Sequence, residues 1–261
     1  MHSNNSPLGA LEPSGHVVQL HGSNEQILQA NAVSYLAEGL KRGGGVLIIA
    51  TAAHLEAFGR ELLRIGVDTD SAIRSGRMAT ADAESALARF MVGGHPDGER
   101  FDRVVGTAVR EVKKTSGDNG VRAYGEMVGL LWQAKQYPAA IRLEQLWNKL
   151  RSEISFELFC AYPIDVLDKD FDAAIVDALL CAHTHLLPSS ADESLQLALN
   201  RAIDEVWGSE AHPDGRVNKK QKKDWAALPK SESTILWLRA NHPDQADAIL
   251  ARAWTYYQAS A

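Results

Sequence analysis

Short apolar runs alternate with longer amphipathic stretches over the first two-thirds of the chain. The runs at 16–21, 46–51 and 156–161 have the length of β-strands, and the last two are almost continuously apolar, as strands covered on both faces are. Residues 77–80 and 121–127 predict two further strands. Because strands and helices alternate, we expect an α/β fold: a mostly parallel sheet with helices on both faces.

Helices are expected wherever apolar residues recur every three or four positions. Leu55, Phe58 and Leu62 form such a stripe, and Gly66 is a natural end for their helix. Pro138 is suited to the first turn of another helix. The same reasoning predicts helices over residues 27–40, 54–65, 83–91, 100–114, 138–150 and 170–186.

The pattern changes beyond Pro188, where strand-like runs stop. Residues 190–207, 232–240 and 243–258 read as helices, separated by the polar stretch 208–230. We therefore divide the chain into a flexible leader (1–14), an α/β domain (15–188) and an all-helical C-terminal extension with a basic linker (189–261).

Composition narrows the class of protein. The chain has 261 residues and a formal net charge of −6, which argues against overall attraction to nucleic acid or to an anionic membrane. Two cysteines imply no disulfide framework. The N-terminal stretch lacks the features of a signal peptide, and no apolar run reaches transmembrane length. These features predict a cytoplasmic protein without a membrane partner.

The loop after the first strand lies where many nucleotide-binding proteins carry a phosphate-binding loop. That motif requires a glycine, a lysine and a Ser or Thr at the positions held here by Ile27, Leu28 and Gln29. Leucine offers neither charge nor donor to a γ-phosphate, and Glu25 would repel an anion. Ser23 or Asn24 would then only cap a helix. The sequence predicts no functional phosphate loop and no ATPase activity.

The order of strand, short loop, helix and strand resembles RecA/KaiC-like ATPases, and a narrower resemblance is to the MEDS family. This is a sensory domain named for methanogens, methylotrophs and a dichloromethane-responsive regulator. The residues that carry the match run from about 16 to 187: "HVVQLHGSNEQIL", "YLAEGLKRGGGVLIIAT", "DAESALARFMVGGHPDGERF", "RAYGEMVGLLW", "LEQLWNKL" and "FELFCAYP".

The resemblance implies a degenerate RecA/KaiC-like fold and ligand sensing in prokaryotic signalling. Members of the family often stand beside histidine kinase or DNA-binding modules. In this sequence we find no phosphoacceptor box and no clear helix-turn-helix, and the helical extension stands in their place.

A ligand site is expected at the carboxyl edge of the predicted sheet, where α/β proteins usually bind ligands. Glu126 lies near the end of the fourth predicted strand and could accept hydrogen bonds or act as a base; alternatively, it caps a helix or pairs with an arginine. Trp147 could line a pocket or belong to the core. The predicted ligand-binding residues are His21, Tyr124, Glu126, Trp132, Glu144, Trp147 and Asn148.

A metal site is not predicted. Cys181 and His185 would lie one turn apart on a helix, with His183 pointing elsewhere, and the sequence offers no second matching pair. Cys160 lies in an apolar strand and is interpreted as inert core. No nucleophile elbow or dinucleotide fingerprint occurs, so neither a catalytic residue nor a cofactor is expected.

The extension supplies candidate partner-binding residues: Trp254 and Tyr257 on an apolar helix face, and Lys219 and Lys220 in a basic run. The favoured hypothesis is a non-enzymatic sensor or signalling adaptor that binds a small ligand or a protein partner. Such a partner could be a histidine kinase, a transcription regulator or a second copy of the chain. Two alternatives stay open: an enzyme that uses Glu126, and a nucleic-acid-associated regulator that uses the basic tail, although the acidic net charge disfavours nucleic acid.

Overall fold

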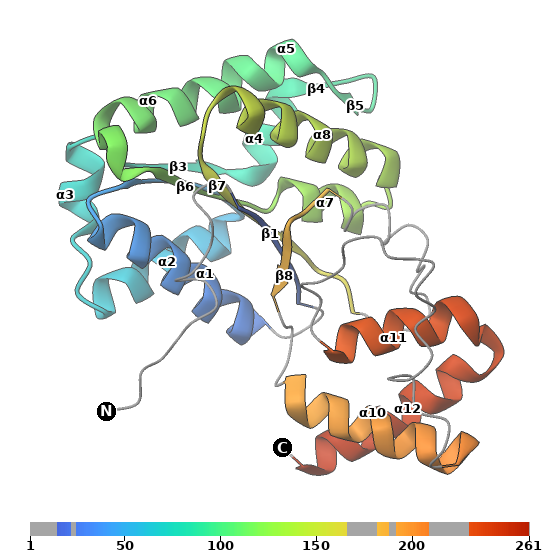
Figure 1. The fold of residues 1–261 in the computed structure, drawn as a ribbon. Coiled ribbons are helices and arrows are strands. Elements are labelled where there is room, and N and C mark those ends of the chain that lie inside the picture. The colour runs from blue at the N-terminus through green and yellow to red at the C-terminus, as the bar shows by residue number, and fades with distance from the viewer. Residues whose placement is uncertain (1–14, 22–24, 166–181, 188–191, 209–229, 261) are drawn as a thin grey trace.

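The computed structural model describes residues 15–21, 25–165, 182–187, 192–208 and 230–260. Its centre is a six-stranded sheet in the order β3-β2-β6-β7-β1-β8, and every pair of neighbouring strands is parallel (Figure 1). The strands are β1 (His16–Leu20), β2 (Gly45–Ala50), β3 (Met78–Asp82), β6 (Val121–Gly125), β7 (Glu157–Tyr162) and β8 (His185–Leu187). The α/β prediction is confirmed, including its five strands.

Helices cover both faces of the sheet (Figure 1). On one face, α1 (Glu25–Lys41) and α2 (Ala52–Arg64) enclose a core that includes Tyr35, Tyr124 and Phe159. On the other face lie α4 (Ala83–Phe90), α6 (Thr107–Ser116), α7 (Met127–Gln133) and α8 (Tyr137–Glu153). Short elements complete the domain: α3 (Thr69–Arg74), β4 (Met91–Val92), β5 (His95–Pro96), α5 (Gly98–Phe101) and the 3-10 turn Gly117–Asn119.

Local sequence accounts for many of these boundaries. All residues of β1, β2 and β6 are buried, and β2 is almost continuously apolar, as a strand covered on both faces should be. Thr51 begins α2 by accepting a hydrogen bond from the backbone N–H of His54, and Asp82 caps α4 in the same way through Ser85. A Cβ at Gly129 would lie 2.8 Å from the carbonyl oxygen of Ala161, so glycine lets α7 pack closely against β7.

Some predicted elements were wrong in type or extent. The helix expected over residues 170–186 gives way at its end to β8, which pairs with β1; residues 166–181 lie outside the described chain. The helix expected over 100–114 is interrupted by a π-helical stretch at Asp102–Gly106. The fourth strand ends at Gly125, so Glu126 occupies the N-cap position of α7 instead of a strand position.

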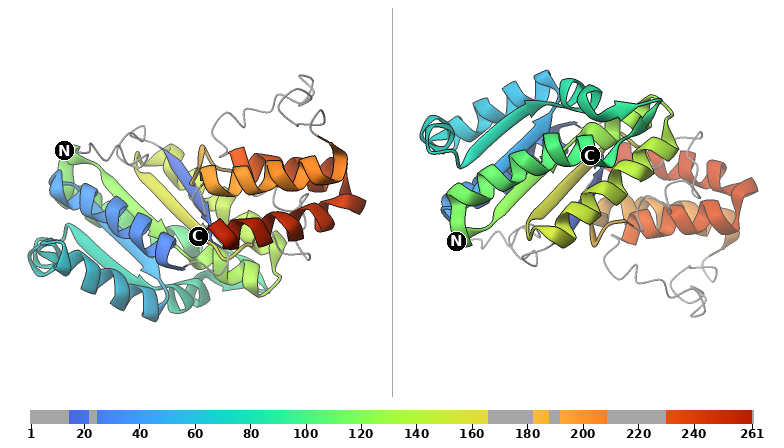
Figure 2. Two further views of the ribbon diagram at one scale, coloured as in Figure 1. Left: turned by 90° about the horizontal axis from the view of Figure 1, so that it is seen from below. Right: turned by 90° about the horizontal axis from the view of Figure 1, so that it is seen from above.

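The C-terminal extension is helical, as predicted, in α10 (Asp192–Trp207), α11 (Lys230–Asn241) and α12 (Pro243–Ser260). These helices lie together beside the α/β domain (Figures 1 and 2). Their buried residues, among them Leu199, Ile235 and Ile249, belong to the same apolar cluster as the core under α7 and α8. Within the described residues, no helix is both long and apolar enough to cross a membrane.

Candidate functional site

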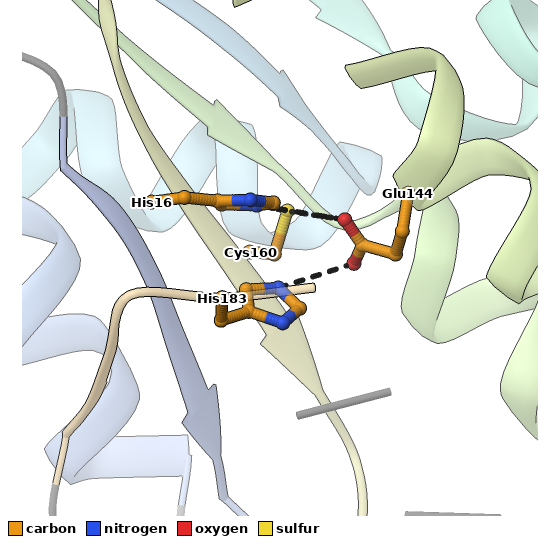
Figure 3. Close-up of side chains that lie close together, drawn as sticks. All are labelled: His16, Glu144, Cys160 and His183. Carbon is orange, nitrogen blue, oxygen red and sulfur yellow. Dashed lines mark hydrogen bonds and ion pairs between the residues drawn. The ribbon is translucent and has the colours of Figure 1, made fainter. Parts of the chain in front are cut away.

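Four buried side chains that can ligate a metal converge between α8 and the sheet (Figure 3). His16 begins β1, Glu144 projects from α8, Cys160 lies in β7 and His183 precedes β8. One nitrogen, oxygen or sulfur atom from each lies within 4.8 Å of those from the others. We call these four residues the buried cluster. The two strands that carry His16 and Cys160 are adjacent, and His16 pairs in register with Leu158, two residues before Cys160.

Glu144 contacts each of the other three residues of the buried cluster. Its Oε2 lies 3.5 Å from Nε2 of His16 and 3.9 Å from Sγ of Cys160, and its Oε1 lies 3.3 Å from Nε2 of His183. The hydroxyl of Tyr162 donates to Oε1 at 2.6 Å. Sγ of Cys160 also lies 3.4 Å from Nε2 of His16. The side chains of His16, His183 and Glu144 are at most 2% exposed.

Neighbouring hydrogen bonds fix the tautomer of His16. Asn148 donates from Nδ2 to the carbonyl oxygen of Ala182 at 3.0 Å, and its Oδ1 accepts from Arg151 at 3.1 Å. That Oδ1 and the Ala182 oxygen lie 3.0 and 3.1 Å from Nδ1 of His16, so Nδ1 faces two acceptors and carries the proton. In the neutral ring, Nε2 therefore presents a lone pair to Glu144 and Cys160.

Burial sets the charges of the buried cluster. Burial and the nearby His183 lower the pKa of His16 to about 3, so its ring is neutral at physiological pH and its contact with Glu144 is not an ion pair. Burial alone would raise the pKa of Glu144, but His183 and the Tyr162 hydroxyl outweigh it and bring the pKa to about 2. Burial and the Glu144 charge raise the pKa of the Cys160 thiol well above its usual value.

A second polar group lies at the carboxyl edge of the sheet, on the α2 side. Glu126 accepts three hydrogen bonds there: from the Tyr124 hydroxyl at 2.7 Å, from the backbone N–H of Thr51 at 2.8 Å, and from Nδ1 of His54 at 2.5 Å. The ring of His54 stacks on Phe58 at 5.4 Å between centroids. The Glu126 carboxylate thus lies at the start of α2, where the helix dipole favours a negative charge.

The pKa shifts of Glu126 and His54 both favour the ionised form of this second group. Burial would raise the pKa of Glu126, but the hydrogen bonds from His54 and Thr51 lower it overall. The hydrogen bond to Glu126 raises the pKa of His54 despite the opposing effect of burial. A carboxylate held ionised by three donors is a poor proton acceptor near neutral pH, because its pKa lies far below the value that suits a general base.

The family of this chain follows from a match to a known family model. A family model described as MEDS (MEthanogen/methylotroph, DcmR Sensory domain) matches residues 15–184. The chain belongs to the MEDS family. The MEDS match includes all four residues of the buried cluster and ends directly after His183. A sensory domain is consistent with a sensor role in signalling. No curated protein and no solved structure gave a significant match.

The structure distributes the ligand-binding residues predicted for the MEDS domain over separate places. Tyr124 and Glu126 belong to the second polar group, whereas Glu144 and Asn148 belong to the buried cluster and its hydrogen bonds. Trp147 packs in the core against Phe101 at a centroid distance of 5.3 Å.

Two further predicted residues lie near the end of β7. Trp132 packs against the rings of Tyr137 and Tyr162, at centroid distances of 4.7 and 5.7 Å. His21 follows β1 and donates its backbone N–H to Tyr162. Among the described residues, the hydrogen-bond partners of Glu126 are Thr51, His54 and Tyr124, and neither Trp132 nor His21 is one of them. A joint crevice remains a prediction; it would be lined by His21, Tyr124, Glu126 and Trp132.

The convergence of the buried cluster was not predicted from the sequence. His183 was considered only together with Cys181 and His185 on a helix, but Cys181 lies outside the described residues and His185 lies in β8. Cys160 was interpreted as inert core, whereas the Sγ of this buried residue faces His16. His54 was missed as a site residue as well, although Thr51, which follows β2 and caps α2, marks a helix start at the sheet edge, with His54 in the first turn.

The remaining predicted positions lie on α1, on α12 or outside the described residues. Leu28, which stands in the lysine slot of the phosphate loop, lies on α1 and is fully buried in the core, while residues 22–24 lie outside the described chain. In α12, Ile249 and Ala253 are buried, whereas Trp254 is 42% exposed with its ring 5.7 Å from that of Tyr257. Lys219 and Lys220 lie outside the described residues, as does the leader at 1–14.

Proposed function

We propose that this protein is a non-enzymatic sensor in prokaryotic signal transduction, and that its input site is the buried cluster of His16, Glu144, Cys160 and His183. The observation that carries the proposal is the convergence of four buried side chains that can ligate a metal, within 4.8 Å of one another, inside a sensory domain. Buried polar groups that serve only packing can usually be replaced by apolar ones. Burying four side chains of the kinds that ligate metals costs free energy, because they lose their contacts with water.

The cluster is well placed to pass a signal along the chain. His183 lies directly before β8, and Thr184 is hydrogen-bonded to both backbone groups of His16, at 2.8 and 2.9 Å. β8 in turn precedes α10, the first helix of the extension. A change in the cluster would therefore act on β8, the strand that precedes the helical extension in the chain.

Contact with a signalling partner is proposed for the extension. Trp254 and Tyr257 form an aromatic pair on α12 with Trp254 partly exposed, and tryptophan and tyrosine are enriched at protein interfaces. A histidine kinase, a transcription regulator or a second copy of the chain would each suit a sensor that signals through this face. The basic residues Lys219 and Lys220 would add attraction to an acidic partner.

An enzyme that uses Glu126 as its base is less well supported. Its carboxylate is engaged by Tyr124, Thr51 and His54, and its pKa is lowered. Without a free carboxylate of raised pKa, the second polar group is better suited to anchoring α2 on the sheet than to moving protons.

The sensor proposal can be tested in the native host. We would compare genome-wide transcript levels in strains that carry the wild-type gene, a deletion, Glu144→Ala, or the surface control Gln145→Ala on the same helix. The deletion should change a defined set of transcripts, and Glu144→Ala should reproduce that set at wild-type protein levels while Gln145→Ala does not. An unchanged deletion strain, or normal regulation by the folded Glu144→Ala protein, would contradict the proposal.

Signal transfer is tested separately on the purified full chain by hydrogen–deuterium exchange. Glu144→Gln should raise exchange in β8 and α10 relative to Gln145→Ala. If exchange changes only within α8, the cluster is not coupled to the extension.

A further inference from the structure

We propose that the buried cluster is a binding site for a single divalent transition-metal ion of the zinc class, ligated by Nε2 of His16, a carboxylate oxygen of Glu144, Sγ of Cys160 and Nε2 of His183. This inference rests on the proposed function, because it names the ligand of the proposed input site. It nevertheless has its own test, since binding and signalling can be measured independently.

The distances between the four side chains fit a tetrahedral ion. With Zn–N and Zn–O bonds of about 2.0–2.1 Å and Zn–S bonds of about 2.3 Å, neighbouring ligand atoms in a tetrahedron are separated by about 3.3–3.6 Å. Nε2 of His16 lies 3.5 Å from Oε2 of Glu144 and 3.4 Å from Sγ of Cys160, and that Sγ lies 3.9 Å from the same oxygen. Nε2 of His183 lies 3.3 Å from the other carboxylate oxygen, Oε1, and the ligand atoms of all four residues lie within 4.8 Å of one another. A group larger than one ion has no room among atoms this close together.

The positions of the hydrogen atoms in the buried cluster also favour a bound cation. Nδ1 of His16 donates to Asn148 and Ala182, so its Nε2 offers a lone pair. Nε2 of His16 and Oε2 of Glu144 then face each other as acceptors at 3.5 Å, with the weakly donating thiol of Cys160 beside both. A metal ion would satisfy all three atoms together, whereas one thiol hydrogen satisfies them poorly.

Metal binding at this site balances in charge and atoms. The ion displaces the thiol proton: M²⁺ and Cys160–SH give the metal thiolate and one H⁺, which leaves to solvent. His183, whose Nε2 faces Oε1 of Glu144, binds as the neutral ring with its proton on Nδ1, and a second H⁺ leaves to solvent where that ring is doubly protonated before binding. Two neutral imidazoles, one carboxylate and one thiolate then carry two negative charges against the two positive charges of the ion. The site is neutral overall, which suits a position where the ligand side chains are at most 2% exposed.

The surroundings resemble the hydrogen-bonded support of known metal ligands. A metal-binding histidine usually donates its other ring N–H to a carbonyl or carboxylate, as His16 does to Ala182 and Asn148. The Tyr162 hydroxyl similarly holds Glu144 at 2.6 Å. Nitrogen and sulfur donors select zinc-class ions over Mg²⁺ and Ca²⁺, which prefer oxygen ligands.

Four protein ligands leave no open position for water or substrate. Closed tetrahedral sites stabilise structure, whereas catalytic zinc sites keep one position free. The ion would therefore act by its presence, fixing His183 and the segment before β8 to α8 and the sheet.

The test uses the purified full-length protein, stripped with a chelator and titrated with Co²⁺ under anaerobic conditions. We expect saturation at one Co²⁺ per chain, with the ligand-field absorption of tetrahedral Co²⁺ and a sulfur-to-cobalt charge-transfer band. One equivalent of Zn²⁺ should displace the Co²⁺ and abolish both absorptions. Cys160→Ser should lose the charge-transfer band, and His16→Ala and Glu144→Ala should lose binding.

Two controls separate this site from others. Cys181→Ser removes the other cysteine and should keep the charge-transfer band, and His95→Ala removes an exposed histidine and should keep full binding. Because ligand variants could unfold, X-ray absorption of the zinc-loaded wild-type protein provides a measurement that needs no substitution; it should show one sulfur at about 2.3 Å with nitrogen or oxygen ligands at about 2.0–2.1 Å.

The outcomes separate the two proposals. Absence of one-to-one binding, absence of sulfur from the zinc-loaded wild type, or loss of the charge-transfer band in Cys181→Ser instead of Cys160→Ser would overturn the metal site. Tight binding at these four residues, combined with normal transcript levels in the Glu144→Ala strain, would uphold the metal site and overturn the sensor assignment.

Discussion

The hydroxyl of Tyr162 donates a hydrogen bond of 2.6 Å to the carboxylate of Glu144, a residue that is 1% exposed. Tyr162 ends β7 and Glu144 lies on α8, so this bond joins the sheet to the helix above it. It also supplies part of the stabilisation that keeps the buried carboxylate ionised, together with His183.

Replacing Tyr162 by phenylalanine removes this donor without opening a large cavity. We expect the free energy of unfolding to fall by about 1–3 kcal/mol, the usual cost of leaving a buried acceptor short of a partner. Urea denaturation of wild type and Tyr162→Phe, compared at constant m-value, measures the change. Tyr137→Phe is a suitable control, because Tyr137 is only half-buried and contacts Trp132 through its ring.

Asn148 is expected to tune the buried cluster from outside it. Its amide connects His16, Ala182 and Arg151, and loss of such a supporting group lowers metal affinity by about 10–100-fold in characterised sites. Asn148→Ala should therefore weaken Co²⁺ binding by this factor while keeping the charge-transfer band. The exposed Gln145→Ala on the same helix should leave affinity unchanged; equal affinities in both variants would show that Asn148 does not support His16.

The His54–Glu126 pair should make stability depend on pH in a defined window. The pKa of His54 is raised from 6.5, so its contribution is complete below pH 6.5 and is lost as pH rises through the folded-state pKa. The pKa of Glu126 is lowered from 4.5, so its contribution is complete above pH 4.5 and is lost as pH falls through the folded-state pKa. The pair therefore stabilises most between pH 4.5 and 6.5.

This window can be measured from unfolding free energies across pH for wild type and His54→Phe. The difference between the two proteins should be largest between pH 4.5 and 6.5 and should shrink on both sides. A difference that is constant with pH would mean that the pair contributes through packing on Phe58 and not through charge.

Leu28 predicts the absence of ATP hydrolysis. It lies on α1 and is fully buried in the core, so its position cannot present a cation to a phosphate. Steady-state phosphate release with Mg²⁺ present should not exceed that of a heat-inactivated control. Leu28→Lys should fail to create activity and should lower stability by more than about 2 kcal/mol, because even truncation of a buried leucine to alanine costs about 2–5 kcal/mol.

The sequence specified the local elements well because their signals are local. The apolar run of β2 and the stripe of Leu55, Phe58 and Leu62 each predict one element from neighbouring residues, and the structure contains both. The three-residue strand β8 was misread, because its identity depends on pairing with β1, a partner far away in the chain.

The same limit explains the candidate site. Glu144 and Asn148 were predicted from their spacing on one helix, but their partners His16, Cys160 and His183 come from other elements. Parallel pairing of β1 with both β7 and β8 brings them together, and strand order cannot be read from local periodicity. His54 and Glu126 meet for a similar reason, across the neighbouring strands β2 and β6.

The position of β1 between β7 and β8 has a consequence for how the chain folds. Among the described strands of the sheet, β1 comes earliest in the sequence, yet it pairs with β7 and β8, which come latest, and the backbone of His16 meets Thr184 across 168 residues of sequence. Contacts of such long range close slowly, because the loop entropy must be overcome before they form. During synthesis, β1 is therefore without these two neighbours until they have been made, and the buried cluster cannot be complete before His183 has been made.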